Sequence, residues 1–245
     1  MLTIVYSDLM RILKNWKHWA VILTVIGFIA FFETSGLAGS GLNTPTNFIF
    51  IYSNAAMLTI LIVGSMELIH VFGADLKGNV YPGLIGAGIP RWKIIAAKYL
   101  LMLILTLIDT LLMAGAAFLF TSMYGIHFEG VYLIRFSRMV LDWWLQMIVY
   151  CAPAVLAAFW TEKMIYMVGI YVFLGSGWHV IAQLFQNVDL GIFFDAIALS
   201  RYTQEIATVL TGNDISFSTI LYLTSIVMGC IAAAIFVFRK KELSF

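Results

Sequence analysis

Six long apolar stretches dominate this chain and limit what it can fold into. They cover about residues 19–37, 48–72, 94–121, 140–160, 164–184 and 217–238. A helix of about 20 apolar residues crosses the ~30 Å hydrocarbon layer of a bilayer, and each stretch reaches that length with its flanks. Only 11% of the residues are charged, whereas soluble domains carry about 25%. The sequence therefore excludes a water-soluble fold and predicts an all-α integral membrane protein with six transmembrane helices.

The positive charges are sorted between the two sides of that membrane. Short loops rich in Lys and Arg stay in the cytoplasm. With a cytoplasmic N-terminus, three of the fourteen Lys and Arg residues fall outside, namely Arg135, Arg138 and Arg201. The other eleven fall inside: Arg11, Lys14, Lys17, Lys77, Arg91, Lys93, Lys98, Lys163, Arg239, Lys240 and Lys241. We therefore predict a multi-pass protein of the cell membrane with both termini in the cytoplasm.

The spans use almost the whole length, so residues 1–245 are predicted to form a single domain in contact with membrane lipid. The net charge is +1, which gives no reason to expect a nucleic-acid partner. Cys151 and Cys230 both fall inside spans, where we expect buried thiols rather than a disulfide.

Residues 1–17 are predicted to form a helix of a different kind. Apolar residues recur there at spacings of three and four, opposite a polar and basic face that contains Arg11, Lys14 and Lys17. Such a helix beside a span is typical of one lying in the membrane interface. It either anchors the first span or also takes part in docking a partner.

The cytoplasmic segment 75–93 is predicted to contain a short helix over residues 80–87. Asn79 is a favourable N-cap, and Pro82 falls in the first turn, where its missing N–H does no harm. Gly88 is predicted to be the left-handed C-cap, and Pro90 stops the helix. Two turns are too short to be stable alone in water, so this helix must pack on something. It is either a tight connection or a lever for a soluble partner.

The outer loops differ in length. Residues 33–47 contain several glycines and a proline and are predicted to form a flexible turn. Residues 186–216 are partly apolar and are predicted to form two short helices, either dipping back into the outer leaflet or lying on its surface.

This layout resembles the membrane subunit of type II ABC exporters, the permease family that includes peptide, bacteriocin, drug and polysaccharide exporters. The resemblance covers the whole chain by topology, including an interfacial N-terminal helix, a short helix after the second span and a partly re-entrant segment before the sixth. The most specific local match is Asp75-Leu-Lys-Gly-Asn79, followed by the short helix, Arg91 and Lys98. Asp75 stands where the family has Glu, and Asn79 where it has Thr.

The resemblance implies a bacterial permease that works with a second permease subunit, identical or homologous, and with separate ATPase chains. ATP and Mg²⁺ would bind those ATPases, since this chain has no Walker-type phosphate loop and no cofactor of its own is expected. The implied substrate is an amphipathic peptide, such as a toxin or bacteriocin, or a lipophilic drug. The implied ATPase contacts are Asp75, Asn79, Val80, Leu84, Ile85 and Arg91.

Asp109 lies near the middle of the third span, where an ionisable side chain costs roughly 2.5–3.5 kcal/mol to insert. It either lines the translocation path or forms a hydrogen-bonded packing contact. Glu67 and His70 are three residues apart and share a helix face, as a proton relay or as a pair at the membrane interface. The four histidines show no metal-ligand spacing, so no metal site is predicted. Tryptophans 143, 144, 160 and 178 are predicted to form aromatic belts at span ends.

The alternative to an exporter subunit is an ATPase-independent secondary transporter or a small intramembrane enzyme. Ser176 and His179 invite a serine-protease interpretation. They lie on one helix, however, with nothing to orient the base, so no catalytic residue is predicted. Secondary transporters usually show several intramembrane charges or broken helices. This chain offers one deep acid, which favours the exporter.

Overall fold

The computed structural model describes residues 1–40, 59–77, 80–126, 129–177, 199–208 and 217–240, and within them every regular element is a helix. The chain begins with α1 (Leu2–Leu13) and α2 (Trp16–Ser40). A helix over residues 59–68 continues as the π-helix η1 (Ile69–Gly73) and then as α4 (Ala74–Lys77). The remaining elements are α5 (Val80–Gly86), α6 (Arg91–Met123), α7 (Val131–Thr161), α8 (Met164–Val172), the π-helix η2 (Phe173–Gly177), α11 (Leu199–Ala207) and α12 (Phe217–Lys240).

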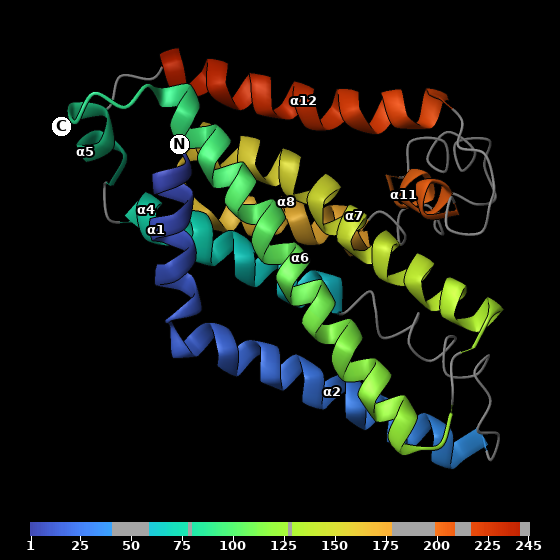
Figure 1. Cartoon of the computed structure of the whole chain (residues 1–245). Coiled ribbons are helices and arrows are strands. Elements are labelled where there is room, and N and C mark those ends of the chain that lie inside the picture. Colours follow the sequence, from blue (N-terminus) through green and yellow to red (C-terminus); the bar gives the residue numbers. More distant parts are fainter. Residues whose placement is uncertain (41–58, 78–79, 127–128, 178–198, 209–216, 241–245) are drawn as a thin grey trace.

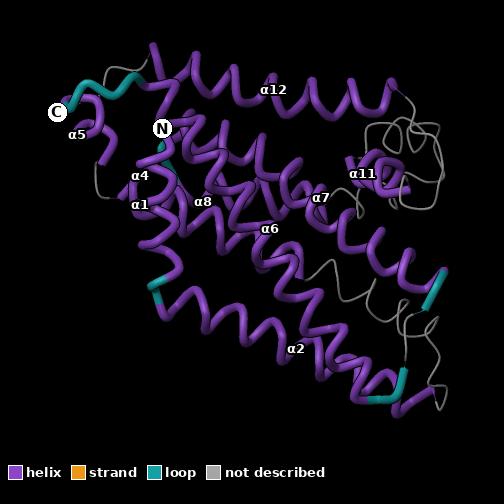
Figure 2. Tube along the Cα trace, viewed as in Figure 1, coloured by secondary structure: helices purple, strands orange, loops and turns teal. Residues whose placement is uncertain are grey.

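The long helices form one bundle in which successive members run in alternating directions (Figure 1). Helices α2 and α12 lie on opposite sides, with α6, α7 and α8 between them, and Figure 2 shows the helical path of the described chain. Helices α1, α4 and α5 gather at the end of the bundle where α6 begins and α12 ends. This end carries much of the positive charge. Arg11 belongs to α1, Arg91 begins α6, and Arg239 and Lys240 end α12.

Three helices are long and apolar enough to cross a membrane, namely α6, α7 and α12. Shorter apolar helical segments are described over Trp16–Phe31, Thr59–Gly73 and Met164–Ser176. The chain is thus an all-α protein of the membrane type. Residues 41–58 and 178–198, which include the predicted start of the second span and end of the fifth, lie outside the described part.

Helix α7 is at the centre of the packing, because it contacts α6, α8, α11 and α12. Trp143 in the middle of α7 is only 3% exposed, so its assignment to an aromatic belt is wrong. The reason is that α7 begins at Val131 and not near residue 140, which moves Trp143 from a helix end into the interior. Trp160 near the other end of α7 is 68% exposed, as a belt residue would be.

Two loop predictions need correction or remain partly open. Helix α2 continues to Ser40, so the predicted turn is wrong over residues 33–40. The apolar residues Leu37 and Ala38 lie between Gly36 and Gly39 there, and isolated glycines at a cost of about 1 kcal/mol each do not stop an established helix. Residues 41–47 lie outside the described part. Of the two helices predicted in residues 186–216, the described part contains α11, which packs against α7 and α12.

The short helix predicted over residues 80–87 is present as α5 (Val80–Gly86). Gly88 has φ +79°, and its N–H donates to the carbonyl of Ile85 at 2.9 Å. The N–H of Ile89 donates to the carbonyl of Leu84 at 3.1 Å. These two bonds form a Schellman ending with glycine in the left-handed position, which confirms the predicted C-cap. Asn79, the predicted N-cap, lies outside the described residues.

Candidate functional site

The break between α1 and α2 places His18 one turn inside α2. The Asn15 side-chain oxygen accepts a hydrogen bond from the Lys17 N–H at 3.1 Å, which is the bond of a helix N-cap. The indole N–H of Trp19 donates to the carbonyl of Leu13 at 2.7 Å and so ties α2 back to the end of α1. The Trp19 ring also lies edge-on to the His18 ring, with centroids 5.4 Å apart. The elbow therefore fixes the direction of the His18 imidazole.

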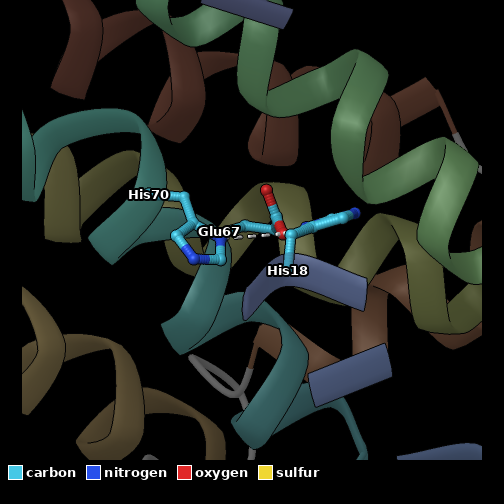
Figure 3. A group of neighbouring side chains, drawn as sticks. All are labelled: His18, Glu67 and His70. Carbon is cyan, nitrogen blue, oxygen red and sulfur yellow. Dashed lines mark ion pairs between the residues drawn. The ribbon is translucent and has the colours of Figure 1, made fainter. Parts of the chain in front are cut away.

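Glu67 and His70 approach His18 from the helix that contains residues 59–73. His70 Nδ1 lies 3.7 Å from Glu67 Oε1, and His18 Nδ1 lies 3.1 Å from the same oxygen. Figure 3 shows the two imidazoles on either side of the Glu67 carboxylate. His70 lies in the π-helical segment η1. Short π-helical segments inside α-helices are frequent at functional sites.

Asp109 of α6 completes the cluster. Its Oδ1 lies 3.5 Å from Nε2 of His18, the nitrogen opposite the one that faces Glu67. Sequence position puts Asp109 about 27 Å along α6 from Arg91, at 1.5 Å per residue. Helix α6 runs obliquely to α12 and crosses between the outer helices (Figure 1). This course brings Asp109 beside the first turn of α2.

The cluster is shielded from solvent. His18, Glu67 and Asp109 are each 0% exposed, and the His70 side chain is 16% exposed. In the described part of the chain, both ring nitrogens of His18 and all four carboxylate oxygens of Glu67 and Asp109 lack a hydrogen bond of good geometry. Neither carboxylate pairs with a Lys or Arg there. Buried charges without such partners are costly, so the polar atoms of this cluster call for a functional explanation.

A second polar cluster lies where α1, α4 and the start of α6 meet, and it joins these three elements. The Lys98 ammonium of α6 pairs with Asp8 of α1 at 2.6 Å and with Asp75 of α4. Arg11 of α1 reaches Asp8 at 3.3 Å and Asp75 at 3.5 Å. Lys98 and Asp75 are both 1% exposed. These ion pairs hold α1 against α4 and α6.

The residues that the resemblance implies as ATPase contacts lie in separate places. Val80 and Leu84 line a groove of about 360 Å³ between α1, α5 and α6, with Asp75 among its walls. Val80 is exposed, whereas Leu84 and Ile85 are partly buried against the core. Asp75 itself is buried and its carboxylate pairs with Lys98 and Arg11. It therefore forms part of the groove wall and holds that wall together.

Arg91 lies apart from this groove, at the end of α12. Its guanidinium donates to the carbonyls of Phe238 at 2.5 Å and Arg239 at 3.1 Å. Arg91 therefore links the start of α6 to the last turn of α12, and it satisfies carbonyls that a helix end leaves free.

An aromatic contact connects α5 to the bundle. The Tyr81 ring lies 5.7 Å from Phe159 of α7 and 5.6 Å from Phe238 of α12, centroid to centroid. The two phenylalanine rings lie 5.0 Å apart. Burial raises the pKa of the Tyr81 phenol well above its ordinary value, and the nearby Asp75 and Asp8 raise it further. The phenol is therefore neutral at physiological pH, and its ring is the part of α5 that is fixed in the core.

Sequence reasoning found part of the buried cluster. The pairing of Glu67 with His70 is confirmed. The fold brings His18 and His70 together, with ring centroids 5.7 Å apart, although their spacing in the sequence does not indicate it. His18 was missed, although a signal existed. It falls at the start of the first predicted span, and Glu67 falls near the end of the second, so two antiparallel spans would place both at similar depth.

The serine-protease interpretation gains no support. The Ser176 hydroxyl donates to the carbonyl of Val172 in its own helix at 2.8 Å, and His179 lies outside the described residues. No family model matches this chain, and no curated protein matches it significantly.

Proposed function

We propose that this chain is the transmembrane subunit of an ATP-driven exporter of the type II ABC class, with six spans and both termini in the cytoplasm. The observation that carries the proposal is the position of α5. This short helix projects beyond the ends of the long helices, at the end of the bundle that carries α1 and the close of α12 (Figure 1). Its exposed Val80 borders an open groove, which is a suitable surface for a soluble ATPase.

The connections of α5 support a role in transmitting movement. Tyr81 packs against the ends of α7 and α12 through Phe159 and Phe238. Asp75, at the other side of the groove, is paired with Lys98 of α6. A displacement of α5 by a nucleotide-driven ATPase would therefore shift three long helices together, as a rigid-body switch does.

The outer part of α6 and α7 supports an apolar or amphipathic substrate. These helices border a groove of about 400 Å³ whose walls include Leu107, Leu111, Val140 and Trp144. Leu111 is 57% exposed. Such a lining fits an amphipathic peptide or a lipophilic drug, and the same face would meet a second permease subunit.

Leu84→Asp tests the proposal. The change puts a carboxylate into the groove contact, where an unpaired charge costs several kcal/mol once the partner covers it. We expect the variant to enter the membrane and elute as a monodisperse species, yet to lose co-purification with the ATPase and transport-stimulated ATP hydrolysis. Val80→Asp is a second variant at a more exposed position and should behave alike.

Gly86→Asp is the matched control. It places the same charge on the same helix, at an exposed position with open space around it and away from the groove lining. It should retain ATPase binding. An ATPase that binds Leu84→Asp as well as it binds the wild type would refute the docking role of α5.

One observation favours a second candidate, a small intramembrane enzyme or an ATPase-independent transporter. The buried cluster of His18, Glu67, His70 and Asp109 supplies ionisable groups that exporter function alone does not require. Purified chain in vesicles without any ATPase distinguishes the two. Transport or turnover under those conditions would end the exporter-subunit proposal.

A further inference from the structure

We propose that His18, Glu67 and His70 bind one divalent transition-metal ion of the zinc class, and that Asp109 orients His18 for this role. The inference rests on the geometry of the buried cluster and is independent of the proposed transport function. It gives a role to the buried polar atoms of the cluster, which have no good hydrogen bonds within the described part of the chain.

The ligand atoms have the spacing that such an ion needs. Two imidazoles and one carboxylate offer one atom each, and these three atoms lie within 4.8 Å of one another. Zinc binds nitrogen and oxygen at about 2.0–2.2 Å in tetrahedral geometry, which puts neighbouring ligand atoms about 3.3–3.6 Å apart. The two distances to Glu67 Oε1, 3.1 and 3.7 Å, lie on either side of that range. A small movement of the imidazoles toward the ion would close the site (Figure 3).

Asp109 supplies the support that metal-binding histidines usually have. A ligating imidazole commonly donates its other N–H to a carboxylate, which fixes its tautomer and direction. Nδ1 of His18 faces Glu67, and Nε2 faces the Asp109 carboxylate at 3.5 Å. With the ion on Nδ1, the proton must sit on Nε2, where Asp109 is the acceptor.

Charge balance also favours a divalent cation. In the described part of the chain the two buried carboxylates have no Lys or Arg partner. When both are ionised they carry two negative charges, and one divalent ion makes the cluster neutral while both imidazoles stay uncharged. Imidazole with carboxylate suits Zn²⁺ among the common divalent ions, whereas Mg²⁺ and Ca²⁺ prefer oxygen ligands alone.

The cluster has an approach from outside. His70 lines a cavity of about 300 Å³ that also borders Arg11, Asn15 and Gly73, next to the elbow between α1 and α2. An ion reaching His70 by this route would join the first turn of α2 to the helix that contains residues 59–73. The site would thus hold the first two apolar helices together near the cytoplasmic end.

The test is metal content and metal-dependent stability of the full chain in detergent, purified through a tag without histidines. The wild type should carry one zinc per chain by elemental analysis. Exchange with Co²⁺ should give the visible absorption of a tetrahedral site, and removal of the ion by a chelator should lower the unfolding temperature. Glu67→Gln and His70→Ala should reduce bound zinc to background, and a chelator should then leave their unfolding temperature unchanged.

Two further variants separate a metal role from a packing role. Asp109→Asn should still bind zinc, with affinity lowered about 10–100-fold, as expected for the loss of a carboxylate behind a ligand. Asp142→Asn, which alters a half-buried acid of α7 outside the cluster, should bind like the wild type. A folded wild type with no zinc and no Co²⁺ spectrum would overturn the proposal, as would full zinc content in Glu67→Gln. The cluster would then be a network of protonated imidazoles and carboxylates. None of these readouts requires an ATPase.

Discussion

Gly64 and Tyr171 show how a single side chain is specified in this core. The Tyr171 hydroxyl is fully buried and donates to the carbonyl of Ile60 at 2.8 Å. A Cβ at position 64 would overlap that hydroxyl. The absence of a side chain at Gly64 therefore allows the tyrosine of α8 to reach the backbone of the helix over residues 59–68.

We predict that Gly64→Ala destabilises the protein by about 1–3 kcal/mol, because an inserted methyl group must displace a well-packed ring. Thermal unfolding in detergent measures the effect. Gly27→Ala in α2 is the control, since a Cβ there meets nothing within 4 Å. Tyr171→Leu removes both the hydroxyl and the ring carbons that the new Cβ would overlap, so the double variant should lose less stability than the two single changes added together. Full additivity would contradict the contact.

At the scale of elements, the sequence predicted the backbone well where the conformation depends only on neighbouring residues in the chain. The C-cap at Gly88 was predictable because a left-handed residue before Pro90 depends on neighbours in the chain. The position of Trp143 was not, since the start of α7 extends past the apolar stretch that marks a span. The buried cluster was half predictable. Glu67 and His70 share a helix face, whereas the approach of His18 and Asp109 depends on how α2 and α6 cross.

Lys98 is the buried cation of the ion-pair network that docks α1 on the bundle, so we predict that Lys98→Met loosens this helix. The change leaves the carboxylates of Asp8 and Asp75 facing each other without the ammonium between them. Removing one member of a buried ion pair costs about 3–5 kcal/mol. Trypsin should then cut faster at Lys14 and Lys17, beside the elbow that α1 otherwise holds, and mass spectrometry of the fragments measures this.

The control for that experiment is Lys93→Met, at a more exposed lysine of the same helix outside the ion-pair network. It removes the same charge and should leave the cleavage rate at the elbow unchanged. Equal cleavage of both variants would mean that α1 is held by the Arg11–Asp75 pair and by its apolar contacts through Val5 and Ile12, and not by Lys98.

At the scale of the whole molecule, the charge pattern and the bundle point to one orientation. The long helices alternate in direction, and the elements that carry Arg11, Arg91, Arg239 and Lys240 meet at one end (Figure 1). By the positive-inside rule we expect that end to face the cytoplasm. The end of α6 at Met123 is then predicted to lie outside, and α5 inside.

Cysteine labelling in intact cells checks this orientation. In a chain with Cys151 and Cys230 replaced by alanine, a cysteine at Met123 should react with an impermeant thiol reagent, because this position is 81% exposed at the end of α6. A cysteine at Gly86, exposed in α5, should react only after the cells are opened. Met123 is the last residue of α6, and Gly86 lies in α5 just before α6 begins. If α6 crosses the membrane, the two cysteines must therefore report opposite sides. Labelling of Gly86→Cys from outside would invert the topology and remove α5 from reach of any cytoplasmic ATPase.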